Sequence, residues 1–448
     1  MSNNLNLTEG KIRSTLVKLS LPIMGTSFIQ MAYNLTDVMW LGRLSTKSVA
    51  AAGVAGFFMW FGSALALVSQ IGVGVNVAQC NGRGDYVSAR KYISNGFQLD
   101  LFLAVTYSML LFIFRHNIIG FFNLKDEEVI KMAIEYLSIV SIGMTFQFLN
   151  PVYSTILNSS GNSVTPFKIN TMGLIANIII DPLLIFGPGP LPNLGIRGAA
   201  IATILSQFIV FLIFFVSGKI NSLIYADVKL NEKPDRKIMK NILMLGVPPF
   251  LQSGLHSVIS MMLTKIIGSF GPVAVAVQSI GAQIESITWM SAEGFSTAIS
   301  AFTGQNFGAR KLDRIKEGYH EGIQILGSIG ILSTLFLIFA AEFIFSIFVP
   351  KDPVAIKEGI NYLRILGLSQ FFMSVEIGTA GAFNGLGRTM PPTVIGVVFN
   401  ILRIPAAIIL ASTVLGVSGV WWSISTSSIF KGIILYIWFK IVLKKLKI

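Results

Sequence analysis

Long apolar runs recur along the whole of this 448-residue chain and decide which folds are open to it. Each run has about 20 residues or more, which is the length that an α-helix needs to cross a bilayer. Transmembrane β-strands would instead give segments of about ten residues with alternating polarity. Only 12% of the residues are charged, about half the fraction found in soluble domains. We therefore predict an all-α polytopic membrane protein.

Twelve transmembrane helices are predicted. Their ranges are 14–41, 49–78, 92–114, 129–157, 166–187, 196–218, 241–268, 275–303, 318–346, 357–384, 392–413 and 416–442. Most Lys and Arg residues fall in the loops on the side of the N-terminus. Because positively charged loops stay in the cytoplasm, both termini are expected there, in a multi-pass protein of the cell (plasma) membrane. The net charge of +13 follows mostly from this topology and does not indicate a nucleic-acid partner.

The second half of the chain repeats the first at a constant offset, which becomes shorter after a small deletion in the second half. Identical residues coincide in these pairs: Pro22 and Pro248, Ser27 and Ser253, Tyr136 and Tyr362, Asn158 and Asn384, and Asn177 and Asn400. Six spans against six predict two pseudo-symmetric six-helix lobes of the same orientation. The lobes are expected over 1–218 and 241–448, joined by a cytoplasmic loop at 219–240. Proline removes a backbone hydrogen bond inside a helix, so Pro22 and Pro248 are expected to act as hinges.

Asp37 is the one ionisable residue in the apolar stretch from Leu19 to Gly42. A charge at the bilayer centre costs about 2.5–3.5 kcal/mol, so such a residue indicates a function and a partner. The topology places four more polar side chains in the same outer layer of the first lobe: Tyr136, Asn177, Asp181 and Thr203. Oxygen ligands of this kind suit Na⁺, and paired carboxylates suit a proton. The choice between H⁺ and Na⁺ stays open, and a hydrogen-bonded network that only packs is the alternative.

Five short motifs lie in order on this frame. They are Pro22…Asp37…Gly42-Arg43, AQxxGxGD at 78–85, LGIRGAAIAT at 194–203, GQNFGAR at 304–310 and NGLGRTxPP at 384–392. Together they resemble the multidrug and toxic compound extrusion (MATE) family, most closely its DinF-like branch, over essentially the whole chain. The resemblance implies a V-shaped pair of lobes and a cation-coupled antiporter. It also implies that Asp37, Asn177, Asp181 and Thr203 carry the proton, or act as metal ligands if the ion is Na⁺.

The second lobe is expected to differ from the first, because Leu263 stands at the repeat position of Asp37 and Ile404 at that of Asp181. Its candidate substrate contacts are Glu376, Glu293, Glu285, Trp289, Met290, His256, Met261 and Met262. The carboxylates would attract a cationic drug, and Trp and Met would form adaptable apolar walls. Ordinary packing is the alternative for the Trp and Met residues. A second cation site stays in doubt, and so does a pairing of Arg403 with one of these acids.

The preferred function is a secondary antiporter, coupled to H⁺ or Na⁺, that exports organic and cationic drugs and toxic compounds by alternating access. The alternative is a flippase of the same superfamily for a lipid-linked oligosaccharide, which would call for a more basic cavity. An enzyme is not expected, because the three histidines are scattered and no HExxH or Walker motif is present. The expected partners are small-molecule drugs and the lipid bilayer, with no cofactor besides the transported ion. The protein is expected to function as a monomer.

Overall fold

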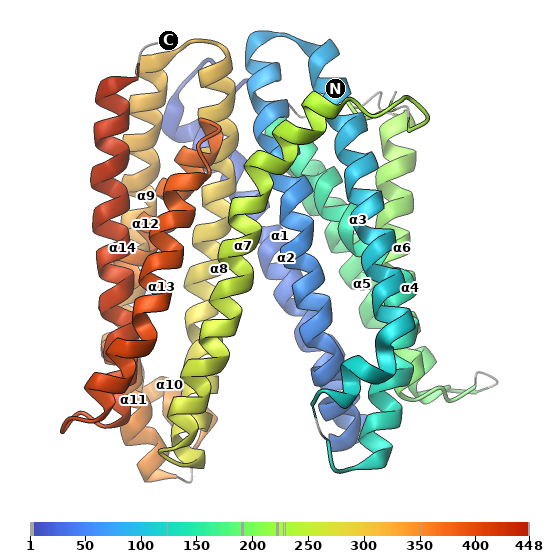
Figure 1. Ribbon diagram of the computed structural model, residues 1–448, viewed down its shortest axis with the longest axis vertical. Coiled ribbons are helices and arrows are strands. Elements are labelled where there is room, and N and C mark those ends of the chain that lie inside the picture. Colours follow the sequence, from blue (N-terminus) through green and yellow to red (C-terminus); the bar gives the residue numbers. More distant parts are fainter. Residues whose placement is uncertain are drawn as a thin grey trace. The chain divides into compact units, whose positions relative to one another are not determined.

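The computed structural model describes residues 4–122, 124–189, 192–220, 224–226, 228, 230–350 and 352–446. All regular secondary structure in these residues is helical (Figure 1). The helices, in chain order, are α1 (Ile12–Leu44), α2 (Thr46–Arg83), α3 (Tyr86–Gly120), α4 (Glu127–Ser159), α5 (Val164–Phe186), α6 (Ile196–Ile220), α7 (Arg236–Gly268), α8 (Pro272–Gly308), α9 (Leu312–Phe339), α10 (Ala341–Phe348), α11 (Pro353–Gly367), α12 (Gln370–Gly385), α13 (Met390–Ala411) and α14 (Val417–Lys445).

Nine of the described helices are long and apolar enough to cross a membrane by themselves: α2 to α7, α9, α13 and α14. α1 and α8 are as long, at 33 and 37 residues, but polar and acidic side chains interrupt their apolar sequence. α11 and α12 have only 15 and 16 residues and span as a pair. Adding α1, α8 and this pair to the nine helices gives the twelve predicted spans.

Two of the predicted spans are not continuous helices, and the prediction was wrong at these points. The span 318–346 consists of α9 and α10, which meet at Ala340, and the span 357–384 consists of α11 and α12, which are separated by Leu368 and Ser369. Their repeat counterparts in the first half, α3 and α4, are unbroken. The apolar pattern alone does not show such a break, because apolar residues continue on both sides of it.

The break between α11 and α12 is possible because side chains satisfy the freed backbone carbonyls. Backbone polar groups inside a membrane protein need partners within the protein. Three side chains donate to consecutive carbonyl oxygens: Ser425 to Ile365 at 2.8 Å, Gln370 to Leu366 at 3.1 Å, and Thr334 to Gly367 at 2.8 Å. These donors come from α14, α12 and α9. The break therefore depends on neighbours that are distant in the sequence.

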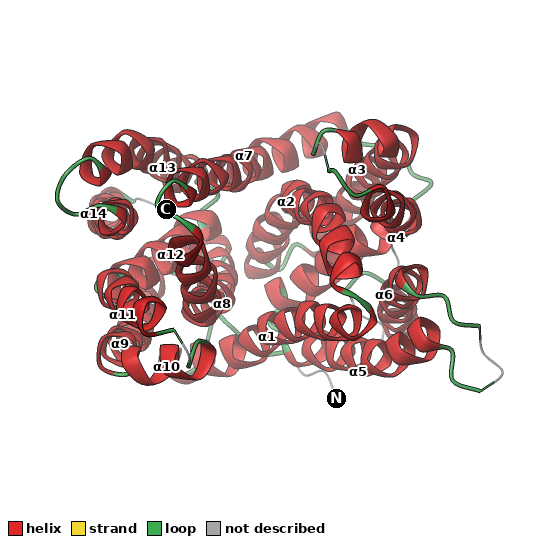
Figure 2. Cartoon of the chain, turned by 90° about the horizontal axis from the view of Figure 1, so that it is seen from below, coloured by secondary structure: helices red, strands yellow, loops and turns green. Residues whose placement is uncertain are grey.

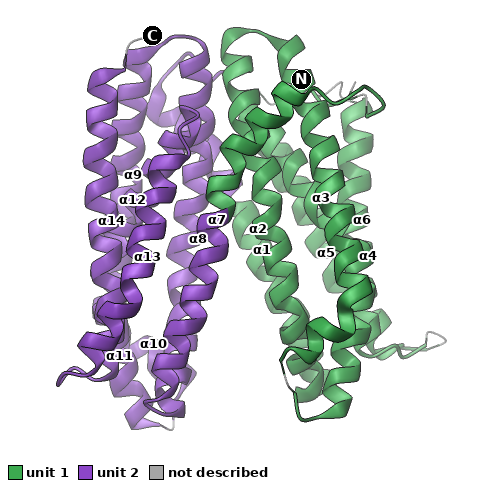
Figure 3. Ribbon diagram, in the orientation of Figure 1, with its two compact units in different colours: residues 1–5, 25–250 green, residues 6–24, 251–448 purple. Residues whose placement is uncertain are grey.

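The chain divides into two compact units (Figure 3). Unit 1 comprises Met1–Leu5 and Gly25–Phe250, and unit 2 comprises Asn6–Met24 and Leu251–Ile448. The boundaries fall inside α1 and α7, in each case two residues after the proline at position 22 or 248. The first part of α1 thus belongs with the second half of the chain, and the first part of α7 belongs with the first half.

Both units repeat one pattern of helix packing. In unit 1, α4 lies against α2, α3 and α6, while α5 lies against α6. In unit 2, α12 lies against α8, α9 and α14, while α13 lies against α14 (Figure 2). Helices that correspond by the sequence repeat therefore have corresponding neighbours.

Glycine allows the exchanged helix ends to pack closely. In unit 1, a Cβ atom at Gly246 of α7 would overlap the carbonyl oxygen of Val68 on α2. In unit 2, a Cβ atom at Gly294 of α8 would lie 2.8 Å from the Cα of Met24 on α1. Small residues permit such close helix contacts in membrane proteins. Val68 of α2 and Gly294 of α8 occupy the same repeat position. In unit 1 the glycine of the contact therefore lies on α7, whereas in unit 2 it lies on α8, the counterpart of α2.

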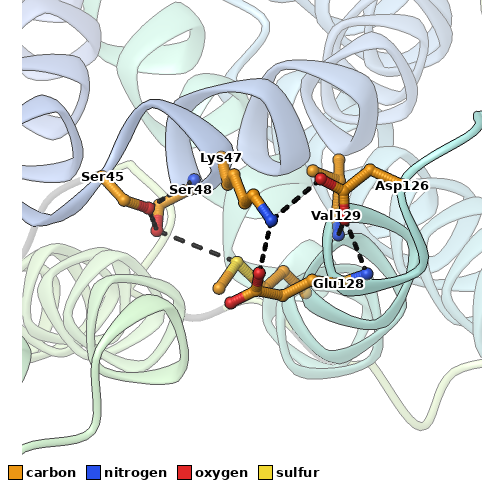
Figure 4. A network of polar contacts seen from close by, with 7 residues as sticks. Ser45, Lys47, Ser48, Asp126, Glu128 and Val129 are labelled. Carbon is orange, nitrogen blue, oxygen red and sulfur yellow. Dashed lines mark hydrogen bonds and ion pairs between the residues drawn. The ribbon is translucent and has the colours of Figure 1, made fainter.

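The starts of α4 and α11 show how far the repeat extends in detail. Asp126 accepts hydrogen bonds from the first backbone N–H groups of α4, and its counterpart Asp352 caps α11 in the same way. In unit 1, Lys47 adds ion pairs to Asp126 at 2.9 Å and to Glu128 at 2.6 Å (Figure 4). The ammonium group lowers the pKa of Asp126 below its ordinary value. Val273 stands at the repeat position of Lys47, so unit 2 has the cap without this ion pair.

Candidate functional site

A cluster of acidic and polar side chains joins three helices inside unit 1. Asn177 of α5 donates from Nδ2 to Oδ1 of Asp37 on α1 at 3.2 Å. Thr203 of α6 donates from Oγ1 to Oδ2 of the same carboxylate at 3.2 Å. Asp181, one turn after Asn177, interacts directly with Asp37. The structure thus brings together four of the five residues that the sequence analysis selected as cation-coupling residues, the fifth being Tyr136.

Helix geometry explains why these side chains meet. Asn177 and Asp181 are four residues apart in α5 and lie on one face of it. Pro182 follows directly inside the helix and leaves the carbonyl of Ile178 without its usual helical partner. Thr203 also lies 3.0 Å from the carbonyl oxygen of Ala199, one turn earlier in α6. One hydroxyl has a single proton, so it donates either to this carbonyl or to the carboxylate.

Two tyrosines and a serine surround the acidic pair. Tyr136 of α4, also selected from the sequence, is 3% exposed and contacts the Thr203 hydroxyl. Tyr33 of α1 donates to a backbone carbonyl of α5 at 3.1 Å and contacts Ser206 of α6. The sequence analysis missed Tyr33 and Ser206. Tyr33 precedes Asp37 by one helical turn, and Ser206 follows Thr203 by three residues, so face periodicity could have identified both.

The cluster has more buried acceptors than donors. Asn177 and Asp181 are fully buried, and neither carboxylate oxygen of Asp181 nor Oδ1 of Asn177 meets a donor within the described part of the chain. Two adjacent carboxylates repel each other unless a proton or cation lies between them. The described residues hold no group of three or more His, Cys, Asp or Glu side chains placed for a metal ion. The side chains that could bind an ion are instead two carboxylates, an amide and a hydroxyl. Their oxygen atoms suit a hard monovalent cation or a proton.

Asp100 of α3 is a further carboxylate inside unit 1, and the sequence analysis missed it. It is fully buried beside Ser69 of α2. Neither of its oxygens has a hydrogen-bond donor within the described residues. Leu326 occupies its repeat position, so this carboxylate, like Asp37, exists in the first half only. Its lone place in the predicted span 92–114 was the signal that could have identified it.

The main acid of unit 2 is in a different setting. Glu376 of α12 is 8% exposed, and its Oε1 lies 2.9 Å from Nζ of Lys431 on α14. Arg403 of α13 donates instead to Ser427 at 2.5 Å and to Ser428 at 3.0 Å. The sequence analysis left open whether Arg403 pairs with one of the acids. In the structure, Lys431 makes the ion pair with Glu376, whereas Arg403 donates to two serines.

The other predicted substrate contacts of unit 2 do not share one environment. Glu285 is half-buried beside Tyr362, whereas Glu293 is exposed and interacts with Glu376. The remaining positions range from half-buried to exposed: Met290, His256, Trp289 at 48%, Met262 at 48% and Met261 at 50%. Their use in substrate binding stays a prediction.

The sequence profile of the MatE family matches residues 22–183 and 248–409, once in each half of the chain. The two matches begin at Pro22 and Pro248, which are equivalent positions of the internal repeat. The chain belongs to the MatE family. Family membership confirms the predicted family, whereas the DinF-like branch stays a prediction. It also indicates transport, not catalysis.

Relatives and solved structures agree over nearly the full length. The probable multidrug resistance protein NorM of Thermotoga maritima is 28% identical over 440 residues, which cover 96% of this chain and 92% of the relative. The FAD transporter of Shewanella oneidensis is 24% identical, covering 97% and 96%. A solved multidrug resistance MATE family transporter of the MOP superfamily, in an outward-facing conformation, has a TM-score of 0.91 and 26% identity, covering 99% and 98%. This similarity confirms the all-α, twelve-span architecture of two six-helix halves.

Proposed function

We propose that this chain is a secondary antiporter that couples the entry of H⁺ or Na⁺ to the export of organic compounds, cationic drugs among them. The observation that carries the proposal is the cluster of Asp37, Asp181 and Asn177, whose buried acceptors outnumber the donors around them. A carboxylate pair without a counter-ion in the chain can take its charge balance from solution. Relatives named as multidrug resistance proteins support drugs as the exported substrates.

The oxygen atoms of the cluster can bind either ion, and the Thr203 hydroxyl favours the proton. When Asp37 is ionised, this hydroxyl donates to Oδ2 of the carboxylate. When Asp37 is protonated, the carboxyl donates to the hydroxyl, whose own proton then goes to the carbonyl of Ala199. Protonation therefore raises the number of these hydrogen bonds from one to two. For Na⁺, the ligands would be oxygens of Asp37, Asn177, Asp181 and Thr203.

Alternating access requires the ion and the substrate to favour different conformations of the same protein. We assign the hinges to Pro22 and Pro248, because each lies inside a long helix two residues before a boundary between the compact units. The proposed moving bodies are the two compact units, which differ from the predicted lobes 1–218 and 241–448, and from their connecting loop 219–240, by the exchanged ends of α1 and α7. The cation connects α1, which contains one hinge, to α5 and α6.

For the substrate, the exposed carboxylate of Glu293 and the neighbouring Glu376 support attraction of cationic drugs. A second candidate is an anionic substrate. Arg403 and Lys431 place two cations inside unit 2, and one relative is named as an FAD transporter. We further propose that the protein lies in the plasma membrane with both termini in the cytoplasm and functions as a monomer.

Efflux from inverted membrane vesicles tests the proposal directly. A cationic fluorescent dye and a flavin nucleotide are offered separately under an imposed pH gradient or an imposed Na⁺ gradient. We expect dye transport under the pH gradient, with sensitivity to a protonophore. Transport that needs Na⁺ and survives the protonophore would replace H⁺ by Na⁺. Transport of the flavin nucleotide alone would favour the anionic substrate, and gradient-independent transport would contradict antiport.

A further inference from the structure

A cavity of about 450 Å³ opens within unit 2 between helices α1, α9, α12 and α14. One end is lined by the basic side chains Arg13 and Lys440 and by His320. The other end is lined by Ile331 and Phe371. His320 and Ile331 are eleven residues apart on α9, so the cavity extends about 16 Å along that helix. It thus joins a basic end to an apolar end.

The basic end has cations available for an anion. Nζ of Lys440 lies 5.5 Å from the ring centre of Tyr436 and 6.0 Å from that of Tyr319, and Lys440 forms no ion pair with the described residues. Arg13 is 67% exposed, and its ion pair with Glu321 is long, at 3.8 Å. No Asp or Glu side chain of the described residues lines the cavity. An anion at this end would therefore meet two cations and no lining carboxylate.

The helix positions place this basic end at a membrane surface. Arg13 is in the first turn of α1, His320 is in the third turn of α9, and Lys440 is near the end of α14. Beyond Ile331, α9 exposes Leu332, Phe336 and Phe339, as a helix does in the hydrocarbon region. The cavity therefore runs from the headgroup level into the acyl-chain level. A soluble anion would use only the basic end of it.

We propose that this cavity binds one anionic glycerophospholipid, with its phosphate at Lys440 and Arg13 and an acyl chain along Ile323, Ile331 and Phe371. Basic pockets between transmembrane helices recognise anionic headgroups. Nζ of Lys440 lies over the rings of Tyr436 and Tyr319, and these cation–π contacts hold the ammonium group at the basic end of the cavity. That the lipid comes from the inner leaflet rests on the cytoplasmic termini of the proposed function, whereas the binding itself does not.

Native mass spectrometry of the purified full-length protein tests this site without any ion gradient or transport. Dioleoylphosphatidylglycerol and dioleoylphosphatidylcholine are titrated separately into the protein in a neutral detergent. We expect wild type to bind the phosphatidylglycerol more tightly than the phosphatidylcholine. Lys440→Gln should lose about fivefold in affinity for the phosphatidylglycerol, and Arg13→Gln combined with Lys440→Gln should lose more. The matched control is Lys444→Gln, which changes an exposed lysine one turn further along α14 that does not line the cavity.

The other outcomes overturn the proposal. Equal losses for Lys440→Gln and Lys444→Gln would show diffuse attraction to a basic surface. Displacement of the lipid by inorganic phosphate at millimolar concentration would show a site for a free anion. Lys440→Arg keeps the charge and should keep binding, so a loss in this variant too would show that the lysine acts only through the fold. A failure of any kind here would leave ion-coupled efflux untouched, because that is measured separately.

Discussion

Asp37 and Asp181 in unit 1 and Glu376 in unit 2 are carboxylates inside helices of one repeated packing pattern, but their charges are balanced in different ways. In unit 1, the partners of Asp37 are an amide and a hydroxyl, and Asp181 has no donor within the described residues. In unit 2, Glu376 has the ammonium group of Lys431 at 2.9 Å. Within the described residues, the chain therefore supplies the counter-ion in unit 2 and not in unit 1.

This difference explains how two similar halves can have different tasks. A buried carboxylate that is balanced by a fixed lysine keeps its environment whatever the ion concentration. A carboxylate pair without such a cation responds to H⁺ or Na⁺ in solution, since only these can relieve the repulsion. The two halves thus share one helical frame, and in the proposed function a few residue differences between them assign the ion to unit 1.

The largest effect is expected from Asp37→Asn. The amide keeps the size and the hydrogen bonds to Asn177 and Thr203, but it cannot take up a proton and has no negative charge to balance a cation. Drug efflux from cells should fall to the level of cells without the transporter, with normal amounts of the protein in the membrane. Asp100→Asn is the matched control in the same unit and should retain efflux. Resistance close to that of wild type in Asp37→Asn would remove the coupling role.

An exchange between repeat positions tests the comparison from both sides. Asp181→Ile copies the residue of unit 2 into unit 1 and should abolish ion-driven efflux while a cationic fluorescent drug still binds. Ile404→Asp places a carboxylate at the corresponding position of unit 2 and should leave the ion dependence of efflux unchanged. Vesicle transport and equilibrium dye binding measure the two properties. Loss of dye binding in Asp181→Ile would show that ion and drug share one site.

Removal of the internal counter-ion should make unit 2 resemble unit 1. Lys431→Met leaves Glu376 as a buried carboxylate without its ammonium partner, which costs about 3–5 kcal/mol of stability. We expect a lower melting temperature that recovers partly when the pH is lowered or Na⁺ is added. The double variant Glu376→Gln with Lys431→Met removes both charges and should recover stability without these additions. A melting temperature of Lys431→Met that ignores pH and Na⁺ would contradict the role of Lys431 as a counter-ion.

The smallest effect is expected at Lys47, whose ion pairs exist in unit 1 only. Its ammonium group lowers the pKa of Asp126. The ion pair therefore contributes fully to the stability of the wild type above the ordinary carboxyl pKa. The contribution is lost as the pH falls through the lowered pKa of the folded state. Lys47→Met should reduce thermal stability slightly at neutral pH and less in acid. Exposed ion pairs contribute little, and a difference that persists in acid or in high salt would point to packing instead.

The sequence largely determined the positions of the membrane spans and of the cluster of acidic and polar side chains around Asp37. Apolar runs of sufficient length must become helices in a bilayer, because the backbone there has to satisfy its own hydrogen bonds. The internal repeat then predicts corresponding helices, and α2 and α8 begin at the equivalent positions Thr46 and Pro272. Depth along alternating spans was sufficient to group Asp37 with Asn177, Asp181 and Thr203.

Only the tertiary structure decided which distant side chains serve one another. Glu376 and Lys431 are far apart in the sequence, and their pairing depends on how α12 packs against α14. The break after Gly367 likewise depends on Thr334 and Ser425, which reach it from α9 and α14. Apolar periodicity gives the face of a helix and its depth, but it does not give the rotation of one helix against another. That rotation is set by close packing, as at Gly432 of α14, where a Cβ atom would overlap the carbonyl oxygen of Phe372 on α12. It determines which carboxylate finds a counter-ion inside the chain.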